Sequence, residues 1–424
     1  MQKLLINGKK ELSGKISISG SKNATLPILA ATILSDKAKL TNIPLVKDIF
    51  TMVELLKFIG LKVNISKDKN TIEIENINKN IKTLAPYKLV KTMRAGVLVL
   101  GPLLAKYKKA KISLPGGCAI GTRPVNLHLF ALKKFGAKIK IKNGYIIAET
   151  RDGLKGANVT FPNISVGATE NAVLAAFNAN GKTILNNCAI EPEVKDLIKF
   201  LNKLGGRIKI VGRKILITGC KKIKKKITHE VIFDRIELGT YMIAAALVGK
   251  KVIFNKIDPR VIKNEIRTLK KMGVKLQIQK STIEIYKSNN IKKISISTKP
   301  YPGFPTDLQA QLMVLMTRAQ GASKIKESIF ENRFMHVPEL KRMGANIEIK
   351  NKIAIIKGPS KLTGAEVMAT DLRASVSLVL AGLVADNRTI INRIYHLDRG
   401  YEFLEKKLKT VSYTHLTLPT ILLV

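Results

Sequence analysis

Tryptophan is absent from the sequence, and aromatic residues make up only 5% of its 424 positions. Proteins that stack nucleic-acid bases usually present aromatic side chains for that purpose, so this composition argues against base-stacking recognition. Acidic residues are also scarce: 30 Asp and Glu stand against 74 Lys and Arg, which gives a formal net charge of +44. Because the lysines are scattered and form no basic tail, we interpret the charge as that of an enzyme for anionic substrates rather than of a nucleic-acid binder.

Cysteines are few, and long apolar runs are absent. Cys118, Cys188 and Cys220 are too few and too scattered for a disulfide framework or a metal site, which indicates a reducing compartment. The longest charge-free apolar runs, near 95–105 and 375–385, are too short to span a bilayer, and the apolar run in the first ten residues is too short for a signal peptide. We therefore expect a cytoplasmic protein with no metal, no membrane partner and no nucleic-acid partner.

One helix ending recurs five times along the chain. The pattern Leu-x-x-x-Gly follows an amphipathic stretch and precedes two short β-rich runs, such as 138–141 and 145–149. The glycine is therefore predicted to end each helix, and the two runs to form a hairpin. The five glycines lie roughly 70 residues apart, which indicates a repeated unit; they are Gly60, Gly136, Gly205, Gly273 and Gly344.

The front of each unit is a helix that is apolar on nearly every side, and such a helix is expected to be buried all round. We predict six β-α-β-α-β-β units, three of which would close around three parallel buried helices with their sheets outward, as an inverted (inside-out) α/β barrel. Six units would make two such domains, with a break near 221–229, where a lysine-rich stretch is expected to be solvated. The buried helices are expected at 24–34, 95–104, 168–177, 238–248, 308–316 and 374–384, and short strands at 3–6 and 15–19.

The sixth unit departs from the repeat, because its Leu-x-x-x-Gly ending, expected near position 412, is missing. Residues 409–424 are apolar but contain no hairpin turn. We predict that they form an atypical tail foreign to the fold. An unpaired sheet edge would then make the chain less stable than one with a regular ending.

Positively charged residues recur where the buried helices begin. Lys22, Arg94 and Arg373 stand at helix starts, where the helix dipole disfavours a cation, so we expect an anion to lie near them. Arg333 and Arg399 occupy similar positions before the second helices. The polar residues Thr169, Thr306 and Asp371 at the buried-helix starts are predicted to be helix caps.

Cys118 lies in a loop that contains three glycines, between Pro115 and Pro124, with Arg123 five residues further on. A nearby cation favours the thiolate, so the loop could carry a reactive cysteine. The alternative, a small apolar residue on a surface turn, is equally compatible with this loop taken by itself.

Nine motifs in this order resemble the enolpyruvyl transferases, and among these the members that act on UDP-N-acetylglucosamine. They cover about residues 1–408 and are Ile18–Asn23, Val90–Arg94, Pro115–Cys118, Gly121–Pro124, Ser165–Thr169, Phe304–Asp307, Glu331–His336, Asp371–Arg373 and His396–Tyr401. The resemblance implies two inverted α/β domains, 22–233 and 1–21 plus 234–408, with the active site between them. It implies transfer of the enolpyruvyl group of phosphoenolpyruvate to the sugar 3′-hydroxyl by addition and elimination, with release of phosphate and without a cofactor.

The resemblance also assigns roles to residues. Cys118 matches the general acid and Asp307 the base, while Lys22, Arg123 and Arg399 match ligands of phosphoenolpyruvate. Asn23 and Asp307 match sugar contacts. The remaining expected substrate contacts, several of them in the nucleotide region, are Arg94, Pro124, Val125, Asn126, Leu127, His128, Ser165, Val166, Gly167, Ile329, Glu331, Arg333, Asp371 and Arg373.

Two positions depart from the resembled pattern, since Asn126 stands where many members have Asp and Asn163 where some have Lys. Both lie in the nucleotide region. The alternative within the same fold is the shikimate-pathway enolpyruvyl transferase, which acts on a smaller acid. That group lacks the cysteine loop, so the segments 115–118 and 165–167 argue against it. A basic nucleic-acid binder would explain the charge but not the cations at the starts of buried helices.

We predict that Cys118 is the reactive cysteine, because Cys188 and Cys220 lie in strand-like runs away from any glycine-rich loop. The resemblance implies that the epoxide fosfomycin alkylates this thiol. Peptide mapping by mass spectrometry should therefore place the fosfomycin adduct on Cys118 alone. The variant Cys118→Asp should remain active and resist the drug, because a carboxylic acid can still donate a proton. A label on either of the other two cysteines would contradict the assignment.

Overall fold

The computed structural model describes residues 3–78, 80–115 and 125–411. These residues divide into two compact units. One unit runs from Gly20 to Phe233, and the other combines the residues up to Ser19 with those from Asp234 onward. We call them the continuous unit and the split unit.

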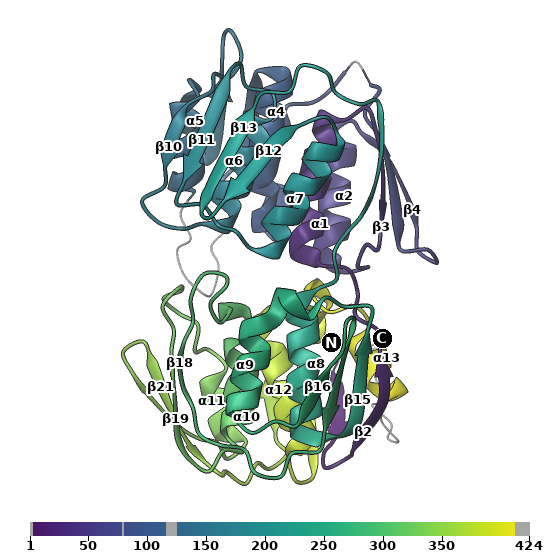
Figure 1. Ribbon diagram of the computed structural model, residues 1–424, viewed down its shortest axis with the longest axis vertical. Coiled ribbons are helices and arrows are strands. Elements are labelled where there is room, and N and C mark those ends of the chain that lie inside the picture. The colour runs from purple at the N-terminus through teal and green to yellow at the C-terminus, as the bar shows by residue number, and fades with distance from the viewer. Residues whose placement is uncertain (1–2, 79, 116–124, 412–424) are drawn as a thin grey trace. The chain divides into compact units, whose positions relative to one another are not determined.

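In the continuous unit, three helical segments contact one another and are almost entirely buried (Figure 1). They are α1 (Lys22–Ala31) with η1 (Thr32–Leu34), η2 (Arg94–Val99) with α4 (Leu100–Tyr107), and α6 (Val166–Ala176). These segments confirm the first three expected buried helices, although the second begins as a 3-10 helix. The outer helices are α2 (Lys47–Ile59), α3 (Tyr87–Val90), α5 (Asn126–Lys134) and α7 (Pro192–Lys203).

Three mixed sheets lie outside these helices. Their strand orders are β14-β3-β5-β4, β6-β7-β9-β8 and β10-β11-β13-β12. The strands are β3 (Lys37–Thr41), β4 (Lys62–Ser66), β5 (Thr71–Glu75), β6 (Leu84–Ala85), β7 (Lys109–Ser113), β8 (Lys138–Lys142), β9 (Tyr145–Glu149), β10 (Asn158–Thr160), β11 (Lys182–Asn186), β12 (Arg207–Val211), β13 (Lys214–Thr218) and β14 (Lys226–Glu230).

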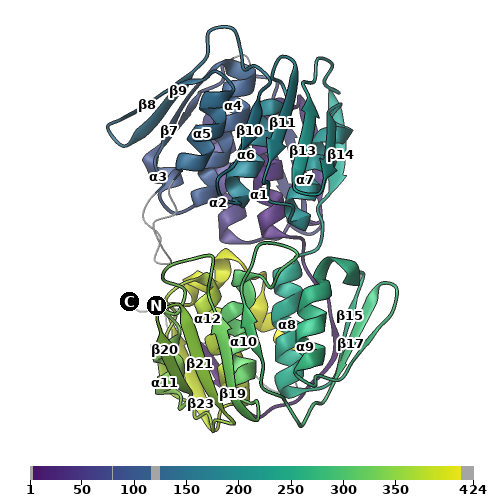
Figure 2. The same cartoon turned by 60° about the vertical axis from the view of Figure 1, so that its left-hand side comes forward.

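The split unit repeats this plan (Figure 2). Its inner helices are α8 (Arg235–Val248), η4 (Thr306–Leu308) with α10 (Gln309–Met316), and α12 (Leu372–Val384), and they contact one another. They confirm the other three expected buried helices. The outer helices are η3 (Pro259–Ile262) with α9 (Lys263–Lys271), α11 (Val337–Arg342), and η5 (Ile394–Arg399) followed by α13 (Leu404–Thr410).

The sheets of the split unit are ordered β16-β17-β15-β2, β18-β19-β21-β20 and β1-β23-β22. Their strands are β1 (Leu4–Asn7), β2 (Leu12–Ile16), β15 (Gly249–Asn255), β16 (Leu276–Ile278), β17 (Thr282–Tyr286), β18 (Ser295–Ser297), β19 (Gly321–Lys326), β20 (Asn346–Lys350), β21 (Ile353–Gly358), β22 (Glu366–Met368) and β23 (Arg388–Asn392). In each four-stranded sheet, one edge strand runs parallel to its neighbour and the other two form an antiparallel hairpin. This shared topology confirms the repeated unit in a mixed α/β fold.

The five glycines of the recurring helix ending all have a positive φ, between +83° and +119°. Residues with a side chain resist this left-handed conformation, whereas glycine adopts it readily. The backbone N–H of each glycine bonds back into the last helical turn, as with Gly60, whose N–H donates to the carbonyl of Leu56 at 3.1 Å. The glycine therefore ends the helix and turns the chain into the hairpin, as predicted.

Two strand expectations need correction. The strand expected at 15–19 is β2 at Leu12–Ile16. The stretch 221–229, expected to mark the break, begins with mostly exposed residues as expected, but it ends in β14, which pairs in parallel with β3 of the first repeat. The boundary between the units follows β14, at Phe233 and Asp234. The local sequence pattern does not show this pairing, because the other strands of the sheet lie about 150 to 190 residues earlier.

The sixth sheet is completed by the start of the chain. Strand β1 runs antiparallel to β23, with Leu4 opposite Ile391, and so takes the place that a hairpin strand holds in the other sheets. The expected tail also begins later than Lys409, since α13 extends to Thr410 and buried Val411 accepts a hydrogen bond from the Ser13 N–H at 2.7 Å. Residues 412–424 lie outside the described part of the chain.

The role of β1 can be tested at Ile6, whose side chain is fully buried beside Gly382. Replacement of Ile6 by Ala should lower the free energy of unfolding by about 2–5 kcal/mol, because it removes buried methyl groups and leaves a cavity. Urea unfolding with limited proteolysis should show that the split unit opens first. Asn7→Ala, on the exposed side of the same strand, is the matched control and should change stability little. Equal stability of the two variants would show that β1 does not hold the sixth sheet.

Candidate active site

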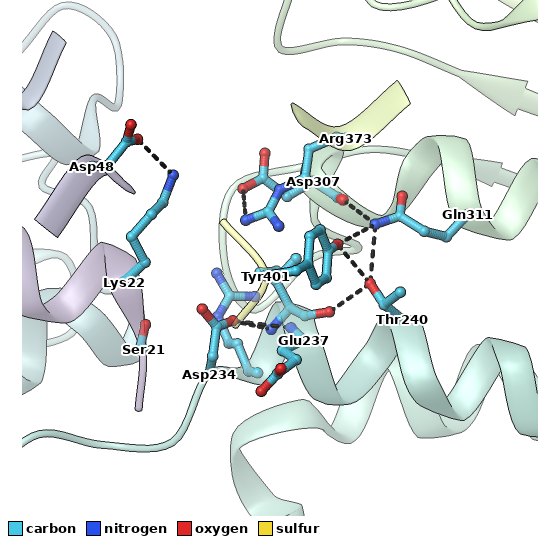
Figure 3. Close-up of polar contacts among 12 residues, drawn as sticks. Ser21, Lys22, Asp48, Asp234, Glu237, Thr240, Asp307, Gln311, Arg373 and Tyr401 are labelled. Carbon is cyan, nitrogen blue, oxygen red and sulfur yellow. Dashed lines mark hydrogen bonds and ion pairs between the residues drawn. The ribbon is translucent and has the colours of Figure 1, made fainter. Parts of the chain in front are cut away.

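The cation at the start of α1 lies next to a carboxylate. Ser21 caps the helix by accepting a hydrogen bond from the Ala24 N–H at 3.3 Å, which places Lys22 in the first turn. The Lys22 Nζ lies 3.2 Å from the Asp48 Oδ2, and both side chains are more than nine-tenths buried (Figure 3). Asp48 stands in the first turn of α2. A buried ammonium at the positive end of a helix needs such a partner, because the dipole and the loss of water both disfavour it.

The fourth repeat contains the same pair. Arg235 begins α8 as Lys22 begins α1, and its Nη1 lies 3.5 Å from the Oε1 of Glu265 in the first turn of α9. Lys22 was predicted from the sequence as a cation at a helix start, but Arg235 was not, and both carboxylate partners were missed. A signal was available, because an acid stands in the first turn of most of the outer helices. In α5 the first turn has no acid, and Asn126 is its first residue.

Asp307 is held between two arginines. Its Oδ1 accepts a hydrogen bond from the Arg333 Nη2 at 2.9 Å, and its Oδ2 accepts one from the Arg373 Nη2 at 3.1 Å. Both guanidinium groups are buried, whereas the carboxylate is about one quarter exposed. The structure therefore brings together three predicted site residues of the split unit.

The Arg373 side chain has donors that no other described residue uses. Asp371 caps α12, as predicted, by accepting from the backbone N–H groups of Arg373 and Ala374 at 2.7 and 3.1 Å. Burial alone would lower the pKa of the Arg373 guanidinium, but the Asp307 carboxylate raises it above its ordinary value. Among the described residues, the Nε and Nη1 atoms of Arg373 have no hydrogen-bond partner. These donors suit a carboxylate or phosphate.

Several residues of the predicted nucleotide region lie around His128. Its imidazole is buried, and its Nδ1 lies 3.0 Å from the Nδ2 of Asn171. The Asn171 side chain also donates to the carbonyl of Val97 and accepts from the N–H of Gly101. Burial and the nearby Arg94 lower the pKa of His128 to about 4, so the ring is neutral at pH 7. A side chain at Gly167 would approach this ring to 3.2 Å. Arg94, His128 and Gly167 are therefore brought together, and Asn171 is a member of the cluster that the sequence did not reveal.

Around this cluster, Ser165 caps α6 by accepting a hydrogen bond from the Ala168 N–H at 3.3 Å, and Val166 is exposed. Two of the three predicted caps are wrong. Thr169 lies inside α6 and accepts a hydrogen bond from the Ala189 N–H, while Thr306 donates to Glu327. In both cases a tertiary partner competes with the helix end for the hydroxyl.

The other predicted residues lie at varied depths. Val125 is buried, Asn126, Ile329 and Glu331 are exposed, and Asn23, Leu127 and Arg399 are intermediate. The loop that carries Ile329 is held by buried Glu327, whose Oε1 accepts from the backbone N–H of Ile329 at 2.8 Å. Glu327 was not predicted.

Cys118, Arg123 and Pro124 lie outside the described residues. The other two cysteines have little thiolate character, since burial raises the pKa of Cys188 to about 12 and also raises that of Cys220. In the described part of the chain, no three His, Cys, Asp or Glu side chains are grouped to hold a metal ion. None of the described helices is long and apolar enough to cross a membrane.

The buried histidine predicts a pH dependence of stability. The folded state lowers the pKa of His128 from 6.5 to about 4, so folding favours the neutral ring. This contribution is complete above pH 6.5 and is lost as the pH falls toward 4, by about 2 kcal/mol at pH 5. Urea unfolding at neutral pH and near pH 5 should therefore show a smaller loss in His128→Gln than in the parent chain. His396→Gln, at a less buried histidine, is the control, and an equal loss in all three proteins would contradict the assignment.

Comparison with known proteins identifies the family. Residues 6–408 match the sequence profile of the family described as EPSP synthase (3-phosphoshikimate 1-carboxyvinyltransferase). A UDP-N-acetylglucosamine 1-carboxyvinyltransferase of Pelagibacter ubique is 58% identical over 413 residues, which cover 97% of this chain and 98% of the relative. The enzyme of the same name from Rickettsia bellii is 52% identical over 409 residues, with 96% and 98% covered.

Solved structures show the same fold at lower identity. The enolpyruvyl transferase NikO from Streptomyces tendae superimposes with a TM-score of 0.88 at 22% identity and covers 98% of this chain and 99% of its own. The EPSP synthase of Acinetobacter baumannii superimposes with a TM-score of 0.76 at 19% identity, with 99% of both chains covered. The expected resemblance is confirmed: the chain belongs to the enolpyruvyl transferase family and, within it, to the UDP-N-acetylglucosamine 1-carboxyvinyltransferases.

Proposed function

We propose that this protein transfers the enolpyruvyl group of phosphoenolpyruvate to the 3′-hydroxyl of UDP-N-acetylglucosamine and releases phosphate, the first committed step of peptidoglycan synthesis. The observation that carries the proposal is the 58% identity, over nearly the whole of both chains, to a relative that bears this enzyme's name. The alternative substrate, 3-phosphoshikimate, is less well supported, because the EPSP synthase structure is only 19% identical to this chain.

The proposed reaction is an addition followed by an elimination, and it needs an acid and a base. The sugar hydroxyl adds to C2 of phosphoenolpyruvate and loses its proton to a base, while C3 gains a proton from an acid. The tetrahedral intermediate then loses C3–H and expels phosphate, which restores the double bond. We assign the acid to Cys118 and the base to Asp307.

Asp307 can act as the base because each carboxylate oxygen has two lone pairs, and arginine hydrogen bonds lower the basicity of the others. Its two oxygens accept hydrogen bonds from Arg333 and Arg373. A bound anion that draws one guanidinium toward itself would release one of these oxygens. This exchange would link substrate binding to activation of the base.

The anionic groups of phosphoenolpyruvate require several cations. Lys22, Arg123 and Arg399 are proposed as its ligands, with Arg94 and Arg373 close to it. The Nε and Nη1 donors of Arg373, which have no hydrogen-bond partner in the described part of the chain, support this role. These proposed ligands come from both of the inverted α/β domains that we propose, 22–233 and 1–21 plus 234–408.

The uridine diphosphate is proposed to bind along residues 123–128 and 165–167. The start of α6 presents backbone N–H groups next to Ser165, which suits a pyrophosphate. Asn23, Ile329, Glu331 and Asp371 are proposed as further contacts to the sugar nucleotide. No cofactor is required by this chemistry, and the proposed location of the enzyme is the cytoplasm.

Release of phosphate from phosphoenolpyruvate tests the proposal. UDP-N-acetylglucosamine should give saturable release, and 3-phosphoshikimate should give none. Asp307→Asn should lower kcat by about 100-fold or more, because the amide cannot accept the proton. Asp386→Asn, which alters a carboxylate that pairs with Lys9 at the surface, is the control and should keep full activity. Phosphate release that depends on 3-phosphoshikimate instead would overturn the assignment.

A further inference from the structure

Tyr401 lies directly behind the Arg373–Asp307 pair. Its side chain is 3% exposed, and the Arg373 guanidinium carbon lies 5.4 Å from the centre of its ring (Figure 3). A guanidinium over an aromatic face is held by the ring quadrupole as well as by contact. The Nη2 of the same guanidinium donates to Asp307 at 3.1 Å, so the ring and the carboxylate both hold this arginine.

The Tyr401 hydroxyl fixes the position of that ring. Its oxygen lies 2.9 Å from the Oγ1 of Thr240. The Thr240 hydroxyl already donates its hydrogen to the carbonyl of Ile236 at 2.9 Å, so in this contact Tyr401 must be the donor. Burial raises the pKa of Tyr401, which keeps the phenol protonated for this role.

Gln311 links this pair to the backbone of Asp307. Its Nε2 donates to the Asp307 carbonyl at 2.9 Å and lies 3.1 Å from the Thr240 Oγ1 and 3.3 Å from the Tyr401 hydroxyl. The three side chains form a closed, buried polar triangle. They come from α8, from α10 and from the segment after η5, which belong to three different repeats.

We propose that Tyr401, Thr240 and Gln311 are positioning residues that set the distance and orientation of Arg373 relative to Asp307 during the reaction. The inference rests on the proposed function, because it assigns Asp307 to the base. Tyr401 supports the arginine, Gln311 fixes the backbone that carries the carboxylate, and Thr240 joins the two. None of the three contacts a reacting atom in this arrangement; each acts through Arg373 or Asp307.

This arrangement answers a requirement of the site. If substrate draws Arg373 away from one oxygen of Asp307, both groups must move without losing their alignment with the reacting atoms. An error of about 1 Å in such a site can cost about 100-fold in rate. The Tyr401 ring limits the movement of the arginine, and the Gln311 amide limits the movement of the backbone that carries the carboxylate. Both side chains are buried, so water does not compete for their hydrogen bonds.

Kinetics of graded variants test the proposal. Tyr401→Phe keeps the ring but loses the donor, and should lower kcat about 10-fold with KM for both substrates within about threefold. Tyr401→Leu also loses the ring and should lower kcat about 100-fold. The acid limb of the pH–rate profile should move to higher pH in Tyr401→Leu. Without the ring, the Arg373 guanidinium can move away from the Asp307 carboxylate, which then protonates more readily. A residue that only stabilises the fold would not move this limb.

A double-mutant cycle and a matched control make the test specific. Thr240→Val removes the acceptor of the same hydrogen bond, so the double variant with Tyr401→Phe should be little slower than either single variant. Tyr241→Phe changes the next residue on α8, another buried tyrosine, whose hydroxyl has no hydrogen-bond partner among the described residues, and should leave kcat unchanged.

The outcomes separate this proposal from the proposed function. If the parent chain releases phosphate with UDP-N-acetylglucosamine, but Tyr401→Phe, Thr240→Val and Gln311→Leu keep the parental kcat per folded molecule, the positioning role is overturned and the function stands. If the parent chain has no such activity, the proposed function fails. If Tyr401→Leu does not fold, the Phe and Val variants still decide the matter. Equal losses in Tyr241→Phe and Tyr401→Phe would also overturn the proposal.

Discussion

A positive charge at the positive end of a buried helix is the constraint on which the site depends. Lys22, Arg235 and Arg373 all begin inner helices, where both the dipole and burial disfavour them. Each has a carboxylate within 3.5 Å: Asp48, Glu265 and Asp307, respectively. In these three inner helices, the buried cation is therefore compensated by a carboxylate from a neighbouring helix.

The repeat was predictable because its signals are local. A glycine in the left-handed conformation ends each helix after Leu-x-x-x, and the buried helices are apolar around their whole circumference. Both features depend on neighbouring residues alone, so they can be read without the fold. The cations of the site were predictable for a related reason. Lys22 and Arg373 lie one and two residues after the capping residues Ser21 and Asp371, which mark the helix start in the sequence.

The pairing of these cations with their carboxylates depends on tertiary packing, within one repeat for Lys22 and Arg235 and between two repeats for Arg373. Gln311 and Tyr401 lie 90 residues apart and meet only because α10 and the segment after η5 pack side by side. Thr169 and Thr306 have the side chains of helix caps, yet bind Ala189 and Glu327 instead. Strand β14 likewise pairs with β3 across nearly the whole continuous unit. In each case a distant partner, absent from the local pattern, decides the outcome.

The place of β1 in the sixth sheet imposes an order on biosynthesis. The continuous unit is complete once Phe233 has been made, so it can fold while the ribosome is still adding residues. The first strands of the chain cannot be used at that stage. Leu4 pairs with Ile391, which is translated nearly 400 residues later, and β2 pairs with β15. The nascent chain must therefore keep the apolar strands β1 and β2 unpaired after the continuous unit has folded, until their partners β23 and β15 have been made.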